Sequence, residues 1–266
     1  MVNPPVVLAV AGTDSGGAAG LAADLATFSA LGVHGAMVVA AVTAQDTTGV
    51  TAIHAVPADV VAAQLEAVLA DLPVAAVKTG MLGSLEAVAL VTRACAGRVL
   101  VVDPVLRATS GADLATDAVV AAYRDVLLPV ATVITPNAAE AGGLLGLDSD
   151  DPMHPAALAT GLTGLGPAVV VTGGPEVAGA ETCTDWLALP GAEPVAISHP
   201  AVATTNDHGT GCTYSSALAS YLALGEDLKT SCARAAAYVS NQLDISKTWT
   251  LGRGRGPVAH THKEIA

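Results

Sequence analysis

The sequence predicts an α/β fold with a mostly parallel central sheet, and three observations support that prediction. Short runs rich in β-branched residues recur along the chain, and alanine-rich segments of helical period lie between them. The runs are almost continuously apolar, as is typical of strands that helices cover on both faces. Regular alternation of strand and helix indicates βαβ units, in which the strands run parallel.

The predicted elements follow in chain order. Strands are expected at 6–12, 36–45, 75–80, 98–105, 131–137 and 168–174, and crossover helices at 58–72, 84–96 and 117–128. Two further helices are expected after glycine-rich loops, one behind the first strand and one starting near residue 212. No composition break or repeat divides the chain, so we predict one domain over 1–266, with weak packing from about residue 250.

Charge and cysteine usage narrow the class of protein. The formal net charge is −13, which repels nucleic-acid phosphates and anionic membrane surfaces. Four widely spaced cysteines without a C-x-x-C pair fit reduced thiols in a cytoplasm. The longest stretches without charged residues contain glycine, proline or hydroxyl residues, which argues against a membrane span. We therefore expect a soluble cytoplasmic protein, in which a phosphorylated substrate would need local charge compensation.

Several predicted strands end in polar or glycine residues: AGTDSGG, TAQDTTG, KTGMLG, DPV, TPN and TGG. Ligands of open α/β sheets collect outside the carboxyl ends of the strands, so these endings are expected to face one crevice. The stretch TNDHGTGCTYSSALA adds a turn, Gly209-Thr210-Gly211, directly before a helix. Such a turn suits a phosphate at the helix N-terminus, where the positive dipole would also favour the thiolate of Cys212. The alternative is an ordinary glycine-capped turn beside a buried cysteine.

Two carboxylates are the candidate magnesium ligands. Asp103 and Glu140 each follow a predicted strand, and Asn137 lies three residues before Glu140. Mg²⁺ usually keeps several waters and binds one or two carboxylates beside substrate phosphates, so the pair suits a nucleoside triphosphate. The alternative is that Glu140 only caps its helix and Asp103 only begins a turn.

The first loop and its neighbours are candidates for a flat ligand. The loop that begins at Gly12 lacks the G-K-[ST] of a P-loop and the G-x-G-x-x-G pattern, but its open backbone could lie against a small ring. Asp24 or Gln45 could bind ring nitrogens and an exocyclic amine, and Gln45 suits an aminopyrimidine edge because its amide both donates and accepts. Met81 could pack on a ring face. The alternatives are that Gln45 pairs with loop backbone and that Met81 fills the core.

In their order and spacing these motifs resemble hydroxymethylpyrimidine and phosphomethylpyrimidine kinases, the thiamin-biosynthetic branch of the ribokinase superfamily. The similarity covers about residues 5 to 245. It implies a ribokinase-like three-layer αβα sandwich, ATP and Mg²⁺ as cofactors, an aminopyrimidine alcohol and its monophosphate as substrates, and a homodimer.

The resemblance also implies roles for individual residues. The ring would be held by Gly12, Asp24, Gln45, Met81 and Val105. Mg-ATP would be organised by Asp103, Asn137, Glu140 and Thr172, with Asp103 and Glu140 reaching Mg²⁺ through water. Gly209, Thr210 and Gly211 would form the anion hole, and Cys212 would take the place of the aspartate base of related sugar kinases.

The chain departs from the family pattern in several places, among them Ala18 and Ala22 in the first loop, where glycine and glutamine are usual. Thr109 and Thr172 stand where members often carry lysine, with Arg107 two residues before the first of them. Weaker compensation of phosphate charge makes the second phosphorylation, of the monophosphate, less certain than the first. Pyridoxal or pyridoxine kinase is the alternative within the fold, because its substrate is also a small ring with a hydroxymethyl group. The second alternative is a non-catalytic ligand-binding protein.

Overall fold

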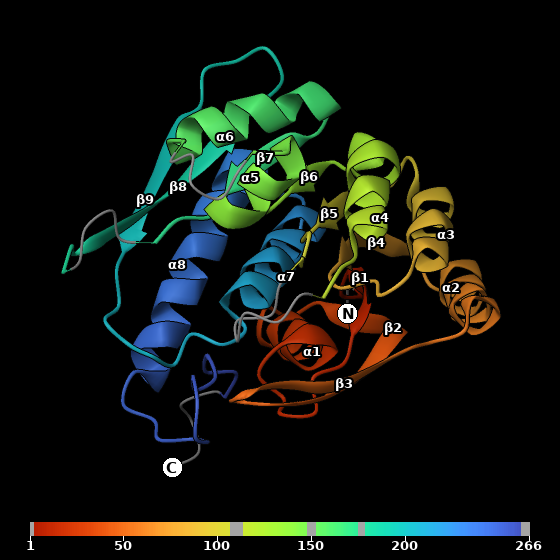
Figure 1. Cartoon of the computed structure of the whole chain (residues 1–266), viewed down its shortest axis with the longest axis horizontal. Helices are drawn as coiled ribbons and strands as arrows, with labels where there is room; N and C mark the ends of the chain where they lie inside the picture. Colours follow the sequence, from red (N-terminus) through yellow and green to blue (C-terminus); the bar gives the residue numbers. More distant parts are fainter. Residues whose placement is uncertain (1–2, 107–113, 148–152, 175–178, 262–266) are drawn as a thin grey trace.

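A computed structural model describes residues 3–106, 114–147, 153–174 and 179–261, which build one twisted sheet with helices on both faces (Figure 1). Within these residues the sheet has nine strands in the order β3-β2-β1-β4-β5-β6-β7-β8-β9. The pairs β2/β3, β7/β8 and β8/β9 are antiparallel, and the other neighbours are parallel. The predicted α/β class with a mostly parallel sheet is therefore confirmed.

The strands are β1 (Val6–Gly12), β2 (His34–Asp46), β3 (Gly49–Ala55), β4 (Val74–Thr79), β5 (Leu100–Val102), β6 (Val133–Ile134), β7 (Ala168–Val171), β8 (Thr182–Ala188) and β9 (Val195–Pro200). The helices are α1 (Gly20–Ala30), α2 (Ala58–Asp71), α3 (Leu85–Cys95), α4 (Asp117–Ala122), α5 (Ala138–Leu145), α6 (Pro155–Leu162), α7 (Thr210–Ala223) and α8 (Leu228–Ser246). Helix α4 continues through a π turn (Tyr123–Leu127) and a 3-10 turn (Leu128–Val130), and a second 3-10 turn (Thr163–Leu165) follows α6.

The core consists of two apolar layers, one on each face of the sheet. Alternate side chains of β1 point to opposite faces, so Leu8 belongs to the apolar layer that includes helices α2 to α6, and Ala9 belongs to the layer that includes α1, α7 and α8. Because both faces are covered, every residue of β1 is buried. This explains why the predicted strands are continuous apolar runs instead of alternating ones.

The order of the strands reverses at the boundary between β1 and β4. The chain moves from β1 to β2 on one side and returns through α2 to β4 on the other. Parallel connections diverge at such a switch point and leave a crevice at the carboxyl ends of the two strands. Gly12 ends β1 at this point, and Gly80 and Met81 follow β4.

Strands β3, β8 and β9 were not predicted. Most side chains of β3 are exposed and β9 has a single buried residue, so both lack the buried apolar run that marked the predicted strands. These two strands extend the sheet at its edges by antiparallel pairing. An edge strand pairs with one neighbouring strand only, and its side chains can stay exposed to solvent. Among the described residues, no helix has the length and apolar character needed to cross a bilayer.

The C-terminal segment corrects a prediction. Weak packing was expected from about residue 250, but Gly256, Val258 and Ala259 are buried. The segment runs beside the loop that precedes α7, since the amide of His208 donates to Gly256 O at 3.0 Å and the amide of Val258 donates to His208 O at 3.0 Å. These bonds are long-range, so the local composition of the segment did not reveal them.

Candidate active site

One hollow of about 210 Å³ opens at the switch point, where the ends of β1, β4 and β5 meet the N-terminus of α7. The predicted site residues that line it are Gly12, Gln45, Met81, Asp103, Val105, Asn137, Glu140, Thr172, Gly209, Thr210, Gly211 and Cys212. Segments far apart in the sequence thus share one surface. Their individual roles stay predictions at this point.

Asp24 is the predicted site residue that the structure places elsewhere. Its side chain has no exposed surface, and its Oδ1 lies 2.7 Å from Lys78 Nζ and accepts from Ser216 Oγ at 2.7 Å. A carboxylate held in this way beneath the hollow cannot contact a ring bound within it. The assignment of Asp24 to the substrate is therefore wrong, because its position early in α1 turns it inward toward β4.

Two helix N-termini meet at Cys212. The residue lies in the first turn of α7, and the amide of Gly20, the first residue of α1, donates to its sulfur. The backbone at Gly209 lies close to the loop before α1. Gly209 has a φ of 93°, and a Cβ there would overlap Ala18 O. Only glycine suits that position, both for its backbone conformation and for its contact with the α1 loop.

The surroundings of Cys212 nevertheless favour the neutral thiol. Burial raises the pKa of Cys212 to about 12, and the carboxylates of Asp24 and Asp103 add to this effect against Lys78 and the Gly20 amide. The expectation that the helix dipole would favour the thiolate is therefore wrong. Burial of the sulfur away from water and the negative charge of the nearby carboxylates both raise the pKa, and together they outweigh the effect of the helix dipole.

The two candidate metal ligands form an electrostatically strained pair. Burial raises the pKa of Asp103 to about 6, although Lys78 and a 3.0 Å hydrogen bond from Ser215 Oγ oppose this. Burial and the charge of Asp103 raise the pKa of Glu140 to about 8. Two neighbouring carboxylates, one buried and one half-buried, whose pKa values are raised in this way are suited to a cation, and Mg²⁺ binds such oxygen ligands.

Glu140 also caps its helix, as the alternative proposed. Its Oε2 accepts from the amide of Asn137 at 3.0 Å, and Asn137 Oδ1 accepts from the amide of Glu140 at 2.9 Å, which completes a capping box. Oε1 accepts from the amide of Leu106 at 3.4 Å. The cap fixes the carboxylate at the rim of the hollow, so the two roles are compatible.

The raised pKa of Glu140 predicts a pH-dependent stability. A carboxyl with a raised pKa stabilises the folded state fully below its ordinary pKa of 4.5, and this contribution is lost as the pH rises through about 8. With a chelator present to remove Mg²⁺, the free energy of unfolding of wild type is therefore expected to fall relative to that of Glu140→Gln as the pH rises from 4.5 to about 8. Urea unfolding at about pH 5 and about pH 9 measures it.

A matched control is Glu86→Gln, since Glu86 is also a first-turn glutamate but is exposed on α3. This substitution is expected to shift the urea midpoint by the same amount at both pH values. Parallel pH profiles of wild type and Glu140→Gln would contradict the burial of Glu140 beside Asp103.

The opposite end of the hollow is suited to a flat ring. Gln45 and Met81 face it across the end of β1, where a Cβ on Gly12 would lie 2.5 Å from Met81 Cε. The missing side chain of Gly12 thus leaves space for the methionine. Thr135 also lines this hollow, and its buried hydroxyl has no protein partner among the described residues.

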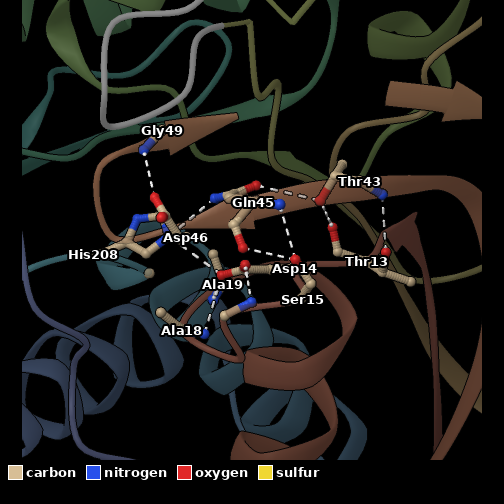
Figure 2. A network of polar contacts seen from close by, with 12 residues as sticks. Thr13, Asp14, Ser15, Ala18, Ala19, Thr43, Gln45, Asp46, Gly49 and His208 are labelled. Atoms are coloured by element: carbon tan, nitrogen blue, oxygen red, sulfur yellow. Dashed lines mark hydrogen bonds and ion pairs between the residues drawn. The ribbon is translucent and has the colours of Figure 1, made fainter. Parts of the chain in front are cut away.

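Sequence reasoning gave no role to the polar network behind Gln45 (Figure 2). Asp14 accepts from the amides of Gly16, Ala18 and Ala19 at 2.8 to 3.0 Å, and its Oδ2 lies 3.2 Å from His208 Nε2. His208 Nε2 also lies 3.0 Å from the Gln45 amide. An aspartate in a glycine-rich turn before a helix is a recognisable local signal, but its contact with His208 spans 194 residues.

A second hollow of about 380 Å³ lies on the other side of the α7 N-terminus. Thr172, Thr210 and Gly211 line both hollows, so the two are adjacent. Thr172, one of the two positions usually occupied by lysine, pairs its backbone with Asn137 between them. Thr109 and Arg107, the other departure, lie outside the described residues.

Comparisons with known proteins agree with this geometry. The sequence model of the phosphomethylpyrimidine kinase family matches residues 14–259. A hydroxymethylpyrimidine/phosphomethylpyrimidine kinase of Rhizobium meliloti is 44% identical over 261 residues, which are 97% of each chain. A thiamine biosynthesis bifunctional protein of Geobacter sulfurreducens is 42% identical over 96% of this chain and 52% of its own. Among solved structures, the ADP complex of Bacillus subtilis pyridoxal kinase is similar with a TM-score of 0.86 at 30% identity, covering 97% of this chain and 98% of that one.

Proposed function

The chain belongs to the phosphomethylpyrimidine kinase family, and on that premise we propose that it transfers the γ-phosphoryl group of ATP to 4-amino-5-hydroxymethyl-2-methylpyrimidine for thiamin biosynthesis. We extend the proposal to a second transfer, onto the monophosphate, because the Rhizobium meliloti relative is named for both substrates. The chain is a phosphotransferase, so the non-catalytic alternative has no support.

One observation carries the proposal: a ring-sized hollow and an anion-binding helix N-terminus share a wall. Gln45 and Met81 stand at one end, and Cys212 with the amides of α7 stands at the other. A hydroxymethyl group on a ring held by Gln45 would point toward Cys212. This is the arrangement that a transfer between ring and phosphate requires.

The proposed role of Cys212 follows from its protonation state. As a neutral thiol, it aligns the acceptor hydroxyl through its sulfur and does not act as a strong base at rest. Phosphoryl transfer has a loose transition state with little bonding to the nucleophile, so alignment and charge compensation outweigh base strength. The amides at Thr210, Gly211 and Cys212 compensate the charge of the moving group.

Asp103 and Glu140 would hold Mg²⁺, which when bound neutralises the phosphate oxygens. Their raised pKa values support this, because a cation would offset the burial that raises both values and the repulsion of Glu140 by Asp103. We propose that the second hollow receives the nucleotide. It begins at Thr172 and Gly211, beside the carboxylate pair, and extends toward α8.

Pyridoxal kinase is the second candidate because of the structural similarity to the Bacillus subtilis enzyme. A substrate panel separates the two functions. The purified protein is incubated with Mg-ATP and, separately, the pyrimidine alcohol, its monophosphate, pyridoxal and ribose, and the products are identified by mass spectrometry. We expect phosphorylation of the pyrimidine alcohol. Turnover of pyridoxal alone would transfer the assignment to the second candidate.

A homodimer stays a proposal. Among the described residues, β3 is an edge strand whose outer side pairs with no other strand, and this supports the proposal together with the exposed apolar side chains Met37, Val42 and Ile53 on β2 and β3. The cytoplasmic location also stays a proposal, with the four free cysteines as its support.

A further inference from the structure

The hydrogen-bond network behind the hollow decides which way the Gln45 amide faces. One end of this amide lies 3.0 Å from His208 Nε2, and the other lies 3.5 Å from Thr43 Oγ1. The oxygen and nitrogen of an amide are nearly equal in size, so the surrounding donors and acceptors determine which end is which. The orientation matters, because it sets the pattern of donor and acceptor that a bound ring meets.

Asp14 requires a hydrogen on His208 Nε2. Burial raises the pKa of Asp14, but hydrogen bonds from His208 and from the amides of Gly16 and Ala19 lower it below its ordinary value, so Asp14 is a carboxylate at neutral pH. An ionised carboxylate only accepts hydrogen bonds. The ring nitrogen that faces its Oδ2 at 3.2 Å must therefore be an N–H, whether the imidazole is neutral or charged.

A protonated Nε2 cannot accept from Gln45. The structure places the amide nitrogen on the His208 side. If Nε2 carries a hydrogen, two donors then face each other; if it does not, Asp14 faces a bare lone pair. With the amide turned over, its oxygen accepts from the same Nε2–H that Asp14 binds. Both acceptors then share one donor in a three-centre hydrogen bond.

Thr43 leads to the same orientation independently. Its hydroxyl has one hydrogen, which it donates to Thr13 O at 2.8 Å. Only lone pairs of Thr43 Oγ1 are left for Gln45, so the end of the amide beside Thr43 is the nitrogen. The backbone of Gln45 is held as well, since its amide donates to Ser15 Oγ at 2.8 Å and its carbonyl accepts from Ser15 Oγ at 2.6 Å.

We propose that His208 and Thr43 are positioning residues that hold the Gln45 amide with its oxygen toward His208 and its nitrogen toward Thr43. This inference rests on the proposed function and deepens it. The bound ring meets a donor on the Thr43 side and an acceptor on the His208 side. An aminopyrimidine matches this pair, with a ring nitrogen that accepts beside an amine that donates, and the amine lies toward His208. Pyridoxal has no such pair, because its ring nitrogen lies between a methyl-bearing carbon and a C–H, and neither can donate a hydrogen bond like an amine.

The position of His208 is itself fixed from both sides of its backbone. Its amide and carbonyl bond to Gly256 O and to the amide of Val258. The C-terminal segment thus holds the imidazole against Asp14 and Gln45, and His208 as a whole residue is 7% exposed.

Histidine nitrogen NMR tests the orientation without using activity. In protein labelled with ¹⁵N-histidine at neutral pH, the His208 signals are identified by their loss in His208→Gln. We expect the Nε2 of His208 to carry a hydrogen. A neutral ring with hydrogen on Nδ1 and a bare Nε2 would overturn the proposal, and this holds even if the protein phosphorylates no pyrimidine.

Kinetics of two amide variants test the consequence for the substrate. The amide of His208→Gln reaches the former position of Nε2, whereas that of His208→Asn is one methylene shorter. We expect His208→Asn to raise KM for the pyrimidine alcohol about tenfold, and to lower the preference for it over pyridoxal about as much, with KM for ATP within about twofold. His208→Gln should stay within about threefold of wild type. Equal KM values for the two variants would overturn the positioning role, whereas wild type that phosphorylates only pyridoxal would overturn the proposed function.

Discussion

Cys212→Ala is expected to lower kcat by about 10²- to 10⁴-fold, the range typical of a lost acid–base or aligning group. The sulfur lies in the first turn of α7 between two helix N-termini, and its loss leaves the acceptor hydroxyl without a partner. The KM for ATP should change little, because the second hollow is lined by other residues. Steady-state kinetics with the pyrimidine alcohol and Mg-ATP measure both quantities.

Two further variants make this result specific. Cys95→Ala removes a thiol that is buried in the core on α3 and is expected to leave kcat unchanged while lowering stability. Cys212→Ser keeps a group that can hydrogen-bond the acceptor, so it should lose less activity than Cys212→Ala. If Cys212→Ala turned over at the wild-type rate, the residue would have no place in the mechanism.

Lys78→Met is expected to lower the free energy of unfolding by about 3 to 5 kcal/mol. Lys78 and Asp24 are fully buried and lie 2.7 Å apart, and the pair links β4 to α1. Although burial lowers the pKa of Lys78, the charge of Asp24 raises it, with an addition from Asp103, so the ammonium is charged. Without it, Asp24 becomes an uncompensated buried carboxylate. Urea unfolding at neutral pH measures the loss.

The exposed pair Lys247 and Asp244 provides the control. Its atoms lie 2.6 Å apart, but its side chains are 47% and 61% exposed, so Lys247→Met should cost no more than about 1 kcal/mol. Adding Asp24→Asn to Lys78→Met should recover part of the loss, because the buried charge is then absent. Equal losses for Lys78→Met and Lys247→Met would contradict the burial of the pair.

The sequence was sufficient to predict those strands and site residues that a local pattern of residues identifies. The runs at β1, β4 and β7 are apolar because both faces of the sheet are covered, and their polar endings form the crevice because parallel strands end on one side. Gln45, Asp103 and Cys212 could be placed there from chain order alone, since each follows such a strand or a glycine turn.

The rest depends on contacts between distant segments. Asp24 looks accessible early in a helix, but Lys78 on a strand 54 residues later draws it into the core. The edge strands β3 and β9 have no apolar run to reveal them, and the glycine-rich C-terminal segment looks loose until its bonds to His208 are seen. The protonation state of Cys212 was also hidden, because its pKa depends first on burial and then on carboxylates that the fold brings close.

Protection of Cys212 from alkylation tests most directly whether the ring alcohol binds beside this sulfur. The protein is treated with a maleimide, and the labelling of each cysteine is followed by peptide mass spectrometry. Cys95, Cys183 and Cys232 are buried and report any unfolding. Pyrimidine alcohol at about ten times its dissociation constant is predicted to slow labelling of Cys212 about tenfold, since only the free protein reacts. An unchanged rate at a concentration that saturates turnover would place the acceptor elsewhere and contradict the account.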